Sequence, residues 1–284
     1  MDHNTNSKMP IYKIAKPILG FIYKLWYNPK IIGRENIPST GSFLIVGNHV
    51  HIMDQCNVII ATKRNIHYLA KMEYFDKNSK EGKFSWFFRG CGCIPVDRNK
   101  KDTEATSMAL EVLKNNHVVG LFPEGTRNKY KEKDLQDLYD KYKGDLSFNE
   151  FYKKIRKSKK TFVEYLVELK DKKFITEDEF IDNLFTSEEF LDDLLLNNRI
   201  TLDEYVDHFL LPFKFGAVSM ANKTNSLIVP YAITGKYKFR SRDLTIRIGK
   251  PFKVDKDLEQ ANLKLQEEVK NLIKISLKKW WQIV

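Results

Sequence analysis

A histidine and an aspartate five positions apart are the first residues in this sequence whose types suggest catalysis. His49 and Asp54 follow the apolar run 42–46, which we expect to form a strand. One helical turn after that strand would bring the Asp54 carboxylate to the His49 imidazole. A carboxylate that orients an imidazole and stabilises its charged form makes a general base. The spacing therefore predicts proton removal from a hydroxyl, with His51 as a second imidazole in the same segment.

Two later segments end in an arginine that is suited to bind an anion. The first ends Ile-Pro-Val-Asp-Arg98, where an ordinary surface arginine at a turn is the competing interpretation. The second reads Phe-Pro-Glu124-Gly125-Thr-Arg127. Gly125 permits close approach of a ligand to the backbone, and Arg127 can grip an anion through two parallel hydrogen bonds. Glu124 would orient that arginine or bind a substrate hydroxyl.

Short apolar runs typical of strands alternate with helical patterns, for example over residues 103–114. This alternation predicts an α/β fold with a mixed, largely parallel sheet flanked by helices. Ligands of such folds gather at the carboxyl ends of strands, where His49 and Arg127 fall. The expected strands cover residues 42–46, 66–70, 94–96, 117–122, 226–233 and 244–248.

The charge divides the chain into two parts. The 284 residues carry a net charge of +11, but residues 129–209 hold 15 basic and 20 acidic side chains, one glycine and no proline. The remainder holds 33 basic and 17 acidic side chains, a net of +16. We therefore expect an α/β domain over 31–128 and 210–284, interrupted by a charged, all-α insertion at 129–209. The basic host favours an anionic partner such as a membrane surface or a phosphorylated substrate.

The insertion repeats one pattern, in which a Ser or Thr is followed three residues later by Glu and then by an aromatic residue. Each copy predicts a capping box at the start of a short helix. The segment before Glu150 resembles the end of a calcium loop, but Lys141 and Lys143 stand where oxygen ligands are needed. No metal is expected. The capping Ser or Thr residues lie at 147, 161, 176, 186 and 201.

Both ends of the chain have the pattern of a membrane-surface helix. Residues 1–30 contain an apolar and aromatic stripe edged by lysines, which predicts a membrane-interface helix, or a helix pair divided at Pro17. Packing on the domain's own core is the alternative. Residues 263–284 are helical in pattern and end with paired lysines and tryptophans. No transmembrane helix or secretory signal is expected, and the three cysteines are expected to be reduced.

Taken in order, these segments resemble the four blocks of the glycerolipid acyltransferases, most closely the branch that acts on 1-acyl-glycerol-3-phosphate (lysophosphatidate). The blocks fall at 48–54, 90–98, 122–127 and 228–231, and the resemblance covers about 28–128 and 210–253. The chain departs from the family in two places. The insertion lengthens the connection between the third and fourth blocks, and His51 stands where a small Ser is common.

The resemblance implies transfer of a fatty acyl group from acyl-CoA or acyl-carrier protein to lysophosphatidate, giving phosphatidic acid. No cofactor beyond the donor is implied, and the site would lie at the cytoplasmic face of a membrane in a peripheral or monotopic protein. Anionic lipids, and a protein partner at 129–209, are further expected contacts. The implied roles are His49 as base, Asp54 as its orienting group, Arg98, Arg127 and Lys214 as phosphate-binding cations, Glu124, Gly125 and Thr126 as shapers of that pocket, and Pro230 as lining of the acyl route.

Other functions compete with this one. The acceptor of the same chemistry would instead be glycerol-3-phosphate or another lysophospholipid. A non-catalytic scaffold on a membrane surface, using residues 129–209 to bind a partner, is a function of a different class. The basic charge also permits nucleic-acid binding, but no recognised nucleic-acid-binding pattern is present, so none is expected.

Overall fold

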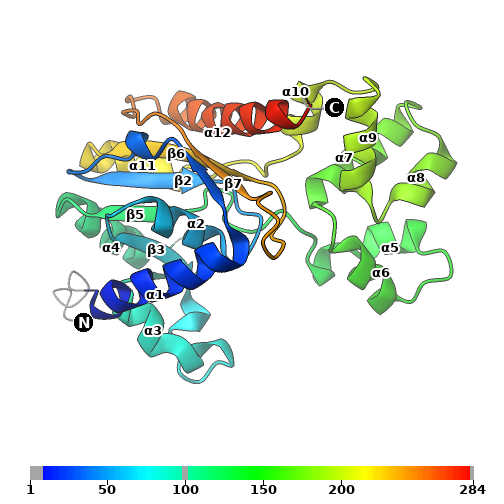
Figure 1. The fold of residues 1–284 in the computed structure, drawn as a ribbon. Helices are drawn as coiled ribbons and strands as arrows, with labels where there is room; N and C mark the ends of the chain where they lie inside the picture. The colour runs from blue at the N-terminus through cyan, green and yellow to red at the C-terminus, as the bar shows by residue number, and fades with distance from the viewer. Residues whose placement is uncertain (1–8, 98–101, 282–284) are drawn as a thin grey trace. The chain divides into compact units, whose positions relative to one another are not determined.

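Seven short strands form one mixed sheet in this computed structural model, which describes residues 9–97 and 102–281 (Figure 1). Their order is β1-β7-β6-β2-β5-β3-β4, and every neighbouring pair is parallel except β6 with β7. The fold class predicted from the sequence is confirmed. The strands are β1 (Lys30–Ile32), β2 (Phe43–Gly47), β3 (Ile66–Lys71), β4 (Ile94–Val96), β5 (Val118–Leu121), β6 (Leu227–Thr234) and β7 (Thr245–Ile248).

The central strands are apolar on both faces because helices cover both. In β2 the residues from Phe43 to Val46 are fully buried. Phe43 and Ile45 belong to a core cluster that also holds Val58 of helix α2 (Asp54–Ala61). The alternate residues of β2 point to the opposite face.

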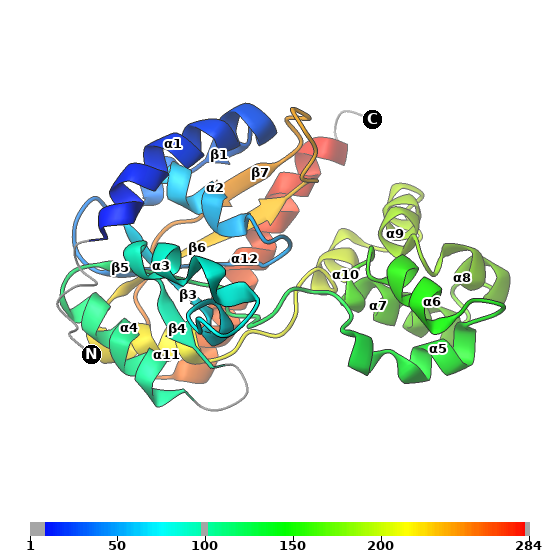
Figure 2. The same cartoon turned by 90° about the horizontal axis from the view of Figure 1, so that it is seen from below.

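Helices lie on both sides of the sheet, as Figure 2 shows. One side carries α1 (Pro10–Tyr27), α2 and the short α3 (Ser85–Gly90). The other side carries α4 (Thr103–Lys114), α11 (Gly216–Thr224) and α12 (Leu258–Trp281). Short 3-10 turns complete the connections. They lie at Arg34–Asn36, Met72–Tyr74, Glu81–Phe84 and Glu132–Asp134.

Helix α1 is continuous although Pro17 lies inside it, so the sequence alternative of a helix pair is not what forms. Tyr12 and Tyr23 are buried against the rest of the domain, while the opposite side of the helix is apolar and exposed. Among the described residues, no helix combines the length and apolar content required to cross a membrane. The exposed side chains, each at least 50% exposed, are Ile14, Ile18, Leu19, Phe21, Ile22, Leu25 and Trp26.

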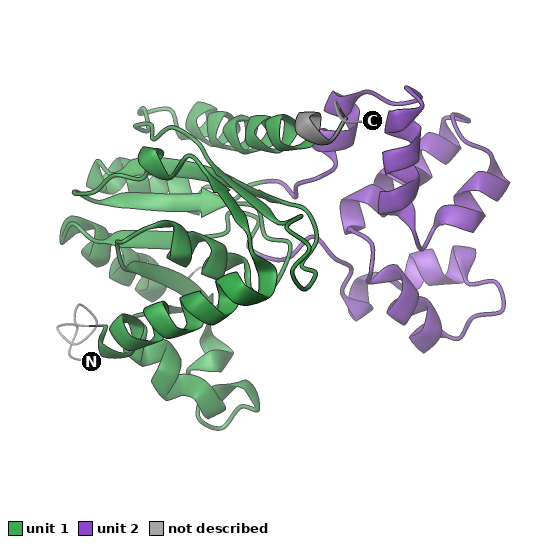
Figure 3. Cartoon of the chain, in the orientation of Figure 1, with its two compact units in different colours: residues 1–125, 213–277 green, residues 126–212, 278–284 purple. Residues whose placement is uncertain are grey.

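The chain divides into two compact units, residues 1–125 with 213–277 and residues 126–212 with 278–284 (Figure 3). The first contains the sheet. In the second, the described residues between 126 and 212 form helices and no strand. These helices are α5 (Gln136–Tyr142), α6 (Phe148–Ile155), α7 (Lys160–Asp171), α8 (Glu177–Asn183), α9 (Ser187–Leu196) and α10 (Leu202–Asp207).

Three of the five predicted capping boxes form, at Ser147, Thr176 and Thr201, where side chain and backbone hydrogen bonds run in both directions. The other two predictions are wrong. Helix α7 begins one residue before Thr161, whose hydroxyl donates instead to the His208 carbonyl. Thr186 is the N-cap of α9, but its side chain makes no cap hydrogen bond.

The predicted strands and the helix at 103–114 are found within one or two residues of their expected ends. Strand β1 was not predicted from the sequence. Helix α12 begins five residues before the expected start at Leu263. The side chains of the paired tryptophans near its end lie outside the description. Within the described part of the chain, no group of three or more His, Cys, Asp or Glu side chains is arranged to hold a metal ion.

Candidate active site

The loop that carries the predicted base is fixed to the end of the sheet by a side chain. Asn48 follows β2 directly and is fully buried. Its Nδ2 donates to the Ile233 carbonyl at 2.9 Å, and its Oδ1 accepts from the Ile233 backbone N–H at 2.7 Å. The side chain thus continues the pairing of β2 with β6 for one more step. It sets the point from which the chain turns toward α2.

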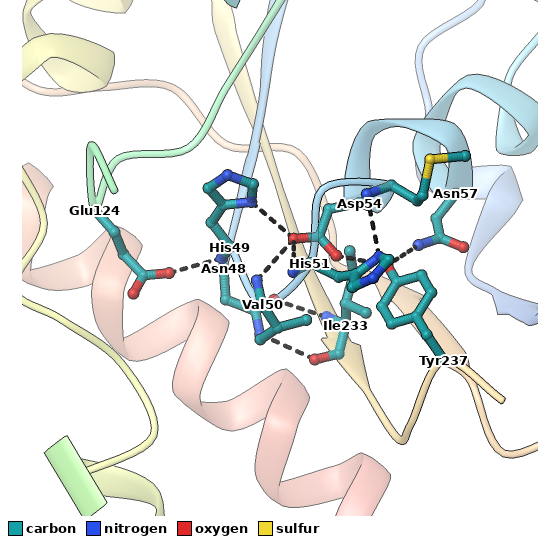
Figure 4. A network of polar contacts seen from close by, with 10 residues as sticks. Asn48, His49, Val50, His51, Asp54, Asn57, Glu124, Ile233 and Tyr237 are labelled. Carbon is teal, nitrogen blue, oxygen red and sulfur yellow. Dashed lines mark hydrogen bonds and ion pairs between the residues drawn. The ribbon is translucent and has the colours of Figure 1, made fainter. Parts of the chain in front are cut away.

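His49 and Asp54 meet as the sequence spacing predicts (Figure 4). The distance from His49 Nδ1 to Asp54 Oδ2 is 2.8 Å. Asp54 is the first residue of α2 and is fully buried, whereas the His49 side chain is 13% exposed. Because the carboxylate accepts at Nδ1, the proton of a neutral His49 belongs on that nitrogen. Its Nε2 is then the acceptor for a substrate proton.

Four donors surround the Asp54 carboxylate. Oδ2 also accepts from the backbone N–H groups of Val50 at 2.7 Å and His51 at 2.8 Å. Oδ1 accepts from the Tyr237 hydroxyl at 2.5 Å. Backbone N–H groups and an imidazole N–H have no lone pair to receive a carboxyl proton, so this arrangement suits the ionised acid. The loop backbone and Tyr237 together fix the direction in which Asp54 faces His49.

Two further contacts hold His49 in place, one on the face of its ring and one at its backbone N–H. It stacks on Phe122, with ring centroids 4.0 Å apart and an interplanar angle of 15°. The backbone N–H of His49 donates to Glu124 Oε1 at 2.7 Å. Glu124 is buried, and it follows β5 in the Phe-Pro-Glu-Gly segment. The structure therefore places Glu124 beside the base, where it fixes the backbone of the histidine.

Gly125 and Lys214 lie against each other. Gly125 has a φ of +70°, a conformation that other residues rarely adopt. A Cβ at Gly125 would lie 2.8 Å from Lys214 Nζ, so the missing side chain makes room for the ammonium group. The Lys214 backbone N–H donates to the Pro123 carbonyl at 2.9 Å, which ties its segment to the turn after β5. Lys214 is exposed, so its charge is open to a ligand.

Thr126 and Arg127 begin the second unit. Arg127 and Lys129 are exposed, while Asn128 between them is buried and bonded to Thr161 at 2.7 Å through its Nδ2. Although the Lys129 residue is exposed as a whole, partial burial of its ammonium group lowers its pKa, and the positive charges of Arg127, Lys159 and Arg156 lower it further. Cations are thus gathered around this segment, a condition that favours an anionic ligand.

The roles of two predicted site residues stay predictions. Arg98 falls outside the described residues. Pro230 is buried in β6, and its carbonyl accepts from the Gly249 N–H at 2.8 Å. A Cβ at Gly249 would lie 2.9 Å from the Pro230 ring and 3.1 Å from Leu272, so this proline packs toward α12. Its part in an acyl route stays a prediction.

The sequence reasoning missed Tyr237 and Asn57. Tyr237 lies in the loop between β6 and β7, 183 positions from Asp54. Asn57 lies one turn after Asp54 on α2, and its Nδ2 donates to the Tyr237 hydroxyl at 2.7 Å. A polar residue three positions after Asp54, directly before the apolar run 58–61, was the available signal for Asn57. No local pattern distinguishes Tyr237 from the other tyrosines.

Three comparisons place this chain among known proteins. A family model described as Acyltransferase matches residues 28–234. A 1-acyl-sn-glycerol-3-phosphate acyltransferase of Bacillus subtilis is 30% identical over 118 residues, or 41% of this chain and 57% of that relative. One from Streptococcus pneumoniae is 29% identical over 97 residues, or 33% and 35%. The matches thus span less than two thirds of either relative.

A solved structure has the same fold. The crystal structure of the 1-acyl-sn-glycerophosphate (LPA) acyltransferase PlsC from Thermotoga maritima aligns with a TM-score of 0.50 at 17% sequence identity. The alignment covers 94% of this chain and 82% of that one. At this identity the likeness concerns the fold alone.

Proposed function

Since this chain belongs to the Acyltransferase family, we propose that it moves a fatty acyl group from a thioester donor to the free hydroxyl of 1-acyl-glycerol-3-phosphate. The observation that carries the proposal is the pairing of a partly exposed His49 with a fully buried Asp54. The names of the Bacillus and Streptococcus relatives support this acceptor.

In the proposed reaction His49 Nε2 accepts the proton of the acceptor hydroxyl as its oxygen attacks the thioester carbonyl carbon. The C–S bond breaks, and His49 returns the proton to the departing sulfur, so that an ester and a thiol are formed. Asp54 stabilises the imidazolium between the two transfers. General-base assistance of this kind contributes roughly 10²–10⁴ in rate. The stack on Phe122 and the Glu124 bond to the backbone keep the imidazole in place.

We propose Lys214 of the first unit and Arg127 of the second unit as cations that bind phosphate groups, and each is described within its own unit. Lys214 lies against Gly125. Because glycine has no side chain, the Lys214 ammonium group is left uncovered. Arg127 lies in a cluster with Lys129, where positive charges face one another. A phosphate would relieve that repulsion and accept charge-assisted hydrogen bonds. Arg98, outside the description, is proposed as a further phosphate ligand.

We also propose that α1 lies in the interface of an anionic membrane, which would supply the lysophosphatidate acceptor. Seven apolar side chains of α1 are exposed on one side, far more than a water-facing helix normally shows. Lys13 and Lys24, both exposed, add charge that anionic lipids attract. Co-sedimentation with vesicles containing phosphatidylglycerol tests this. Ile18→Glu with Phe21→Glu should abolish binding, and binding that survives both changes would contradict the proposal.

The proposed reaction is tested with purified protein, a labelled acyl-CoA or acyl-carrier-protein donor and a mixed pool of lysophosphatidate, glycerol-3-phosphate and other lysophospholipids. Mass spectrometry of the products should show phosphatidic acid as the main new lipid. A different acylated lipid as the main product would identify a different acceptor and leave the proposed acyl-transfer chemistry unchanged. The absence of any acylated product with both donors would overturn the proposed activity.

A further inference from the structure

A chain of hydrogen bonds runs from helix α1 to the candidate base. The Tyr23 hydroxyl of α1 donates to Asn57 Oδ1 at 2.7 Å, and Asn57 Nδ2 donates to the Tyr237 hydroxyl at 2.7 Å. Tyr237 in turn donates to Asp54 Oδ1, whose other oxygen faces His49 (Figure 4). The three bonds from Tyr23 to Asp54 all run in the same direction, and His49 Nδ1 donates to the other oxygen of Asp54 from the opposite side. Such a chain polarises its members cooperatively.

The ring of Tyr237 is held by its neighbours as well as by its hydroxyl. His51 stacks on one face of the ring, with centroids 4.1 Å apart. Tyr27 of α1 meets it edge-on at 5.4 Å. Tyr237 therefore has little freedom to move away from Asp54 while α1 stays in place.

Two further contacts fasten the same loop to α1. The backbone N–H of Arg240 donates to the Trp26 carbonyl at 2.8 Å. The Trp26 and Phe239 rings pack edge to face with centroids 4.9 Å apart, and both side chains are more than half exposed. The last turns of α1 and the loop between β6 and β7 thus form one local structure.

We propose that Tyr237 is a positioning residue for the His49–Asp54 pair, and that Tyr23 and Asn57 make this positioning depend on how α1 is seated. The proposal rests on the proposed acyl transfer, because it acts on the same base. It adds a role for residues that lie outside the four sequence blocks of the family resemblance.

The function of the Tyr237 hydroxyl follows from the charge it faces. Asp54 is fully buried, so each oxygen needs a donor to keep the carboxylate ionised and correctly turned. Three donors come from residues 49–51, all on Oδ2, and Tyr237 supplies the one on Oδ1. Burial, and next the Asp54 charge, raise the pKa of Tyr237, so the hydroxyl keeps its proton and donates. Without it, Oδ1 loses its hydrogen bond and only the bonds to Oδ2 hold Asp54 toward His49.

Tyr237→Phe keeps the ring and its stacking but removes the donor. We expect kcat to fall about tenfold, the lower end of the value of one hydrogen bond to a charged group, with the Michaelis constants of both substrates unchanged. Tyr27→Phe is the matched control, because it removes a hydroxyl from the same aromatic group but outside the chain, and it should keep wild-type kcat. An unchanged kcat in Tyr237→Phe would overturn the proposal.

A double variant separates positioning from simple support of the fold. If Tyr237 acts through the carboxylate, Tyr237→Phe should change kcat less than twofold when Asp54 is already replaced by Asn. A further tenfold loss in that background would show that the hydroxyl acts by another route. Tyr23→Phe should lower kcat about threefold alone and have no effect in the Tyr237→Phe background, since the hydrogen-bonded path through Asn57 and the Tyr237 hydroxyl to Asp54 is then broken. Additive losses would refute the link to α1.

These outcomes are distinct from failure of the proposed function. Wild-type protein and His49→Ala are measured in the same assay, with the same lipids and donor. Acyl transfer that is present in wild type and lost in His49→Ala establishes the base, and only then do the tyrosine variants decide the positioning role. Acyl transfer that persists in His49→Ala refutes both the base and its positioning residue.

Discussion

Replacing Asp54 by Asn changes the charge of the candidate site while nearly preserving its shape. The carboxylate accepts four hydrogen bonds, three of them on Oδ2. An amide oxygen in the Oδ2 position still accepts the backbone bonds from Val50 and His51. The amide nitrogen then faces the Tyr237 hydroxyl, which can accept in place of donating. The fold is therefore retained and the stabilisation of a protonated His49 is lost.

The size of the effect follows from what is removed. A hydrogen bond between two charged groups is about twice as strong as one between neutral groups, and this pair is shielded from water by the burial of Asp54. We expect kcat to fall about 100-fold, which corresponds to about 2.7 kcal/mol in the activation free energy. The urea midpoint should change little. Asp54→Ala would instead remove the acceptor of all four hydrogen bonds and should also destabilise the fold, by about 1–3 kcal/mol for each donor that finds no other partner.

The assay is steady-state acyl transfer to lysophosphatidate with the unfolding midpoint measured on the same preparation. Asp76→Asn is the control, since it makes the same chemical change at an exposed turn where Oδ1 accepts from the Asn78 N–H. Asp76→Asn should leave both kcat and the unfolding midpoint unchanged. A kcat for Asp54→Asn within about threefold of wild type, with the fold intact, would refute the assignment of Asp54 as the partner of the base.

Three more expectations follow from particular contacts. Arg127→Ala should raise the Michaelis constant of the phosphorylated acceptor about tenfold or more and spare that of the donor, and an effect on the donor alone would remove Arg127 from the phosphate site. Tyr231→Phe should raise the unfolding free energy by about 1 kcal/mol, because its buried hydroxyl has no hydrogen-bond partner among the described residues, and a lower urea midpoint would contradict this. Burial raises the pKa of Cys56 from 9.0 to about 11 and of Cys93 to about 12. Unfolded thiols therefore ionise first, so stability should be intact below about pH 9 and fall as the pH rises toward 12, and a urea midpoint that rises over that window would refute the burial of these thiols.

The contact between His49 and Asp54 was predictable because it is local. A strand followed by the first turn of a helix brings residues five apart together whatever the rest of the fold does. The strands were predictable for a related reason, since burial on both faces of β2, β5 and β6 requires continuous apolar runs.

Contacts between distant parts of the chain were not predictable from local pattern. Tyr237 reaches Asp54 only because β6 lies beside β2 and because the loop after β6 packs on α1. The same limit explains the capping boxes that did not form. Thr161 has the residue type and the Glu three positions later, yet its hydroxyl is engaged by His208 and Asn128, both remote in sequence. Tertiary hydrogen bonds there outweigh the local motif.

The account depends on His49 as the base, and one measurement tests it directly. Single-turnover acyl transfer with a labelled donor and lysophosphatidate, followed by mass spectrometry, compares wild type with His49→Gln and His51→Gln. His49→Gln should lose at least about 100-fold in the rate of phosphatidic acid formation, whereas His51→Gln, which removes the ring stacked on Tyr237, should lose less than about tenfold. A His49→Gln variant that folds and forms phosphatidic acid at near the wild-type rate would contradict the account.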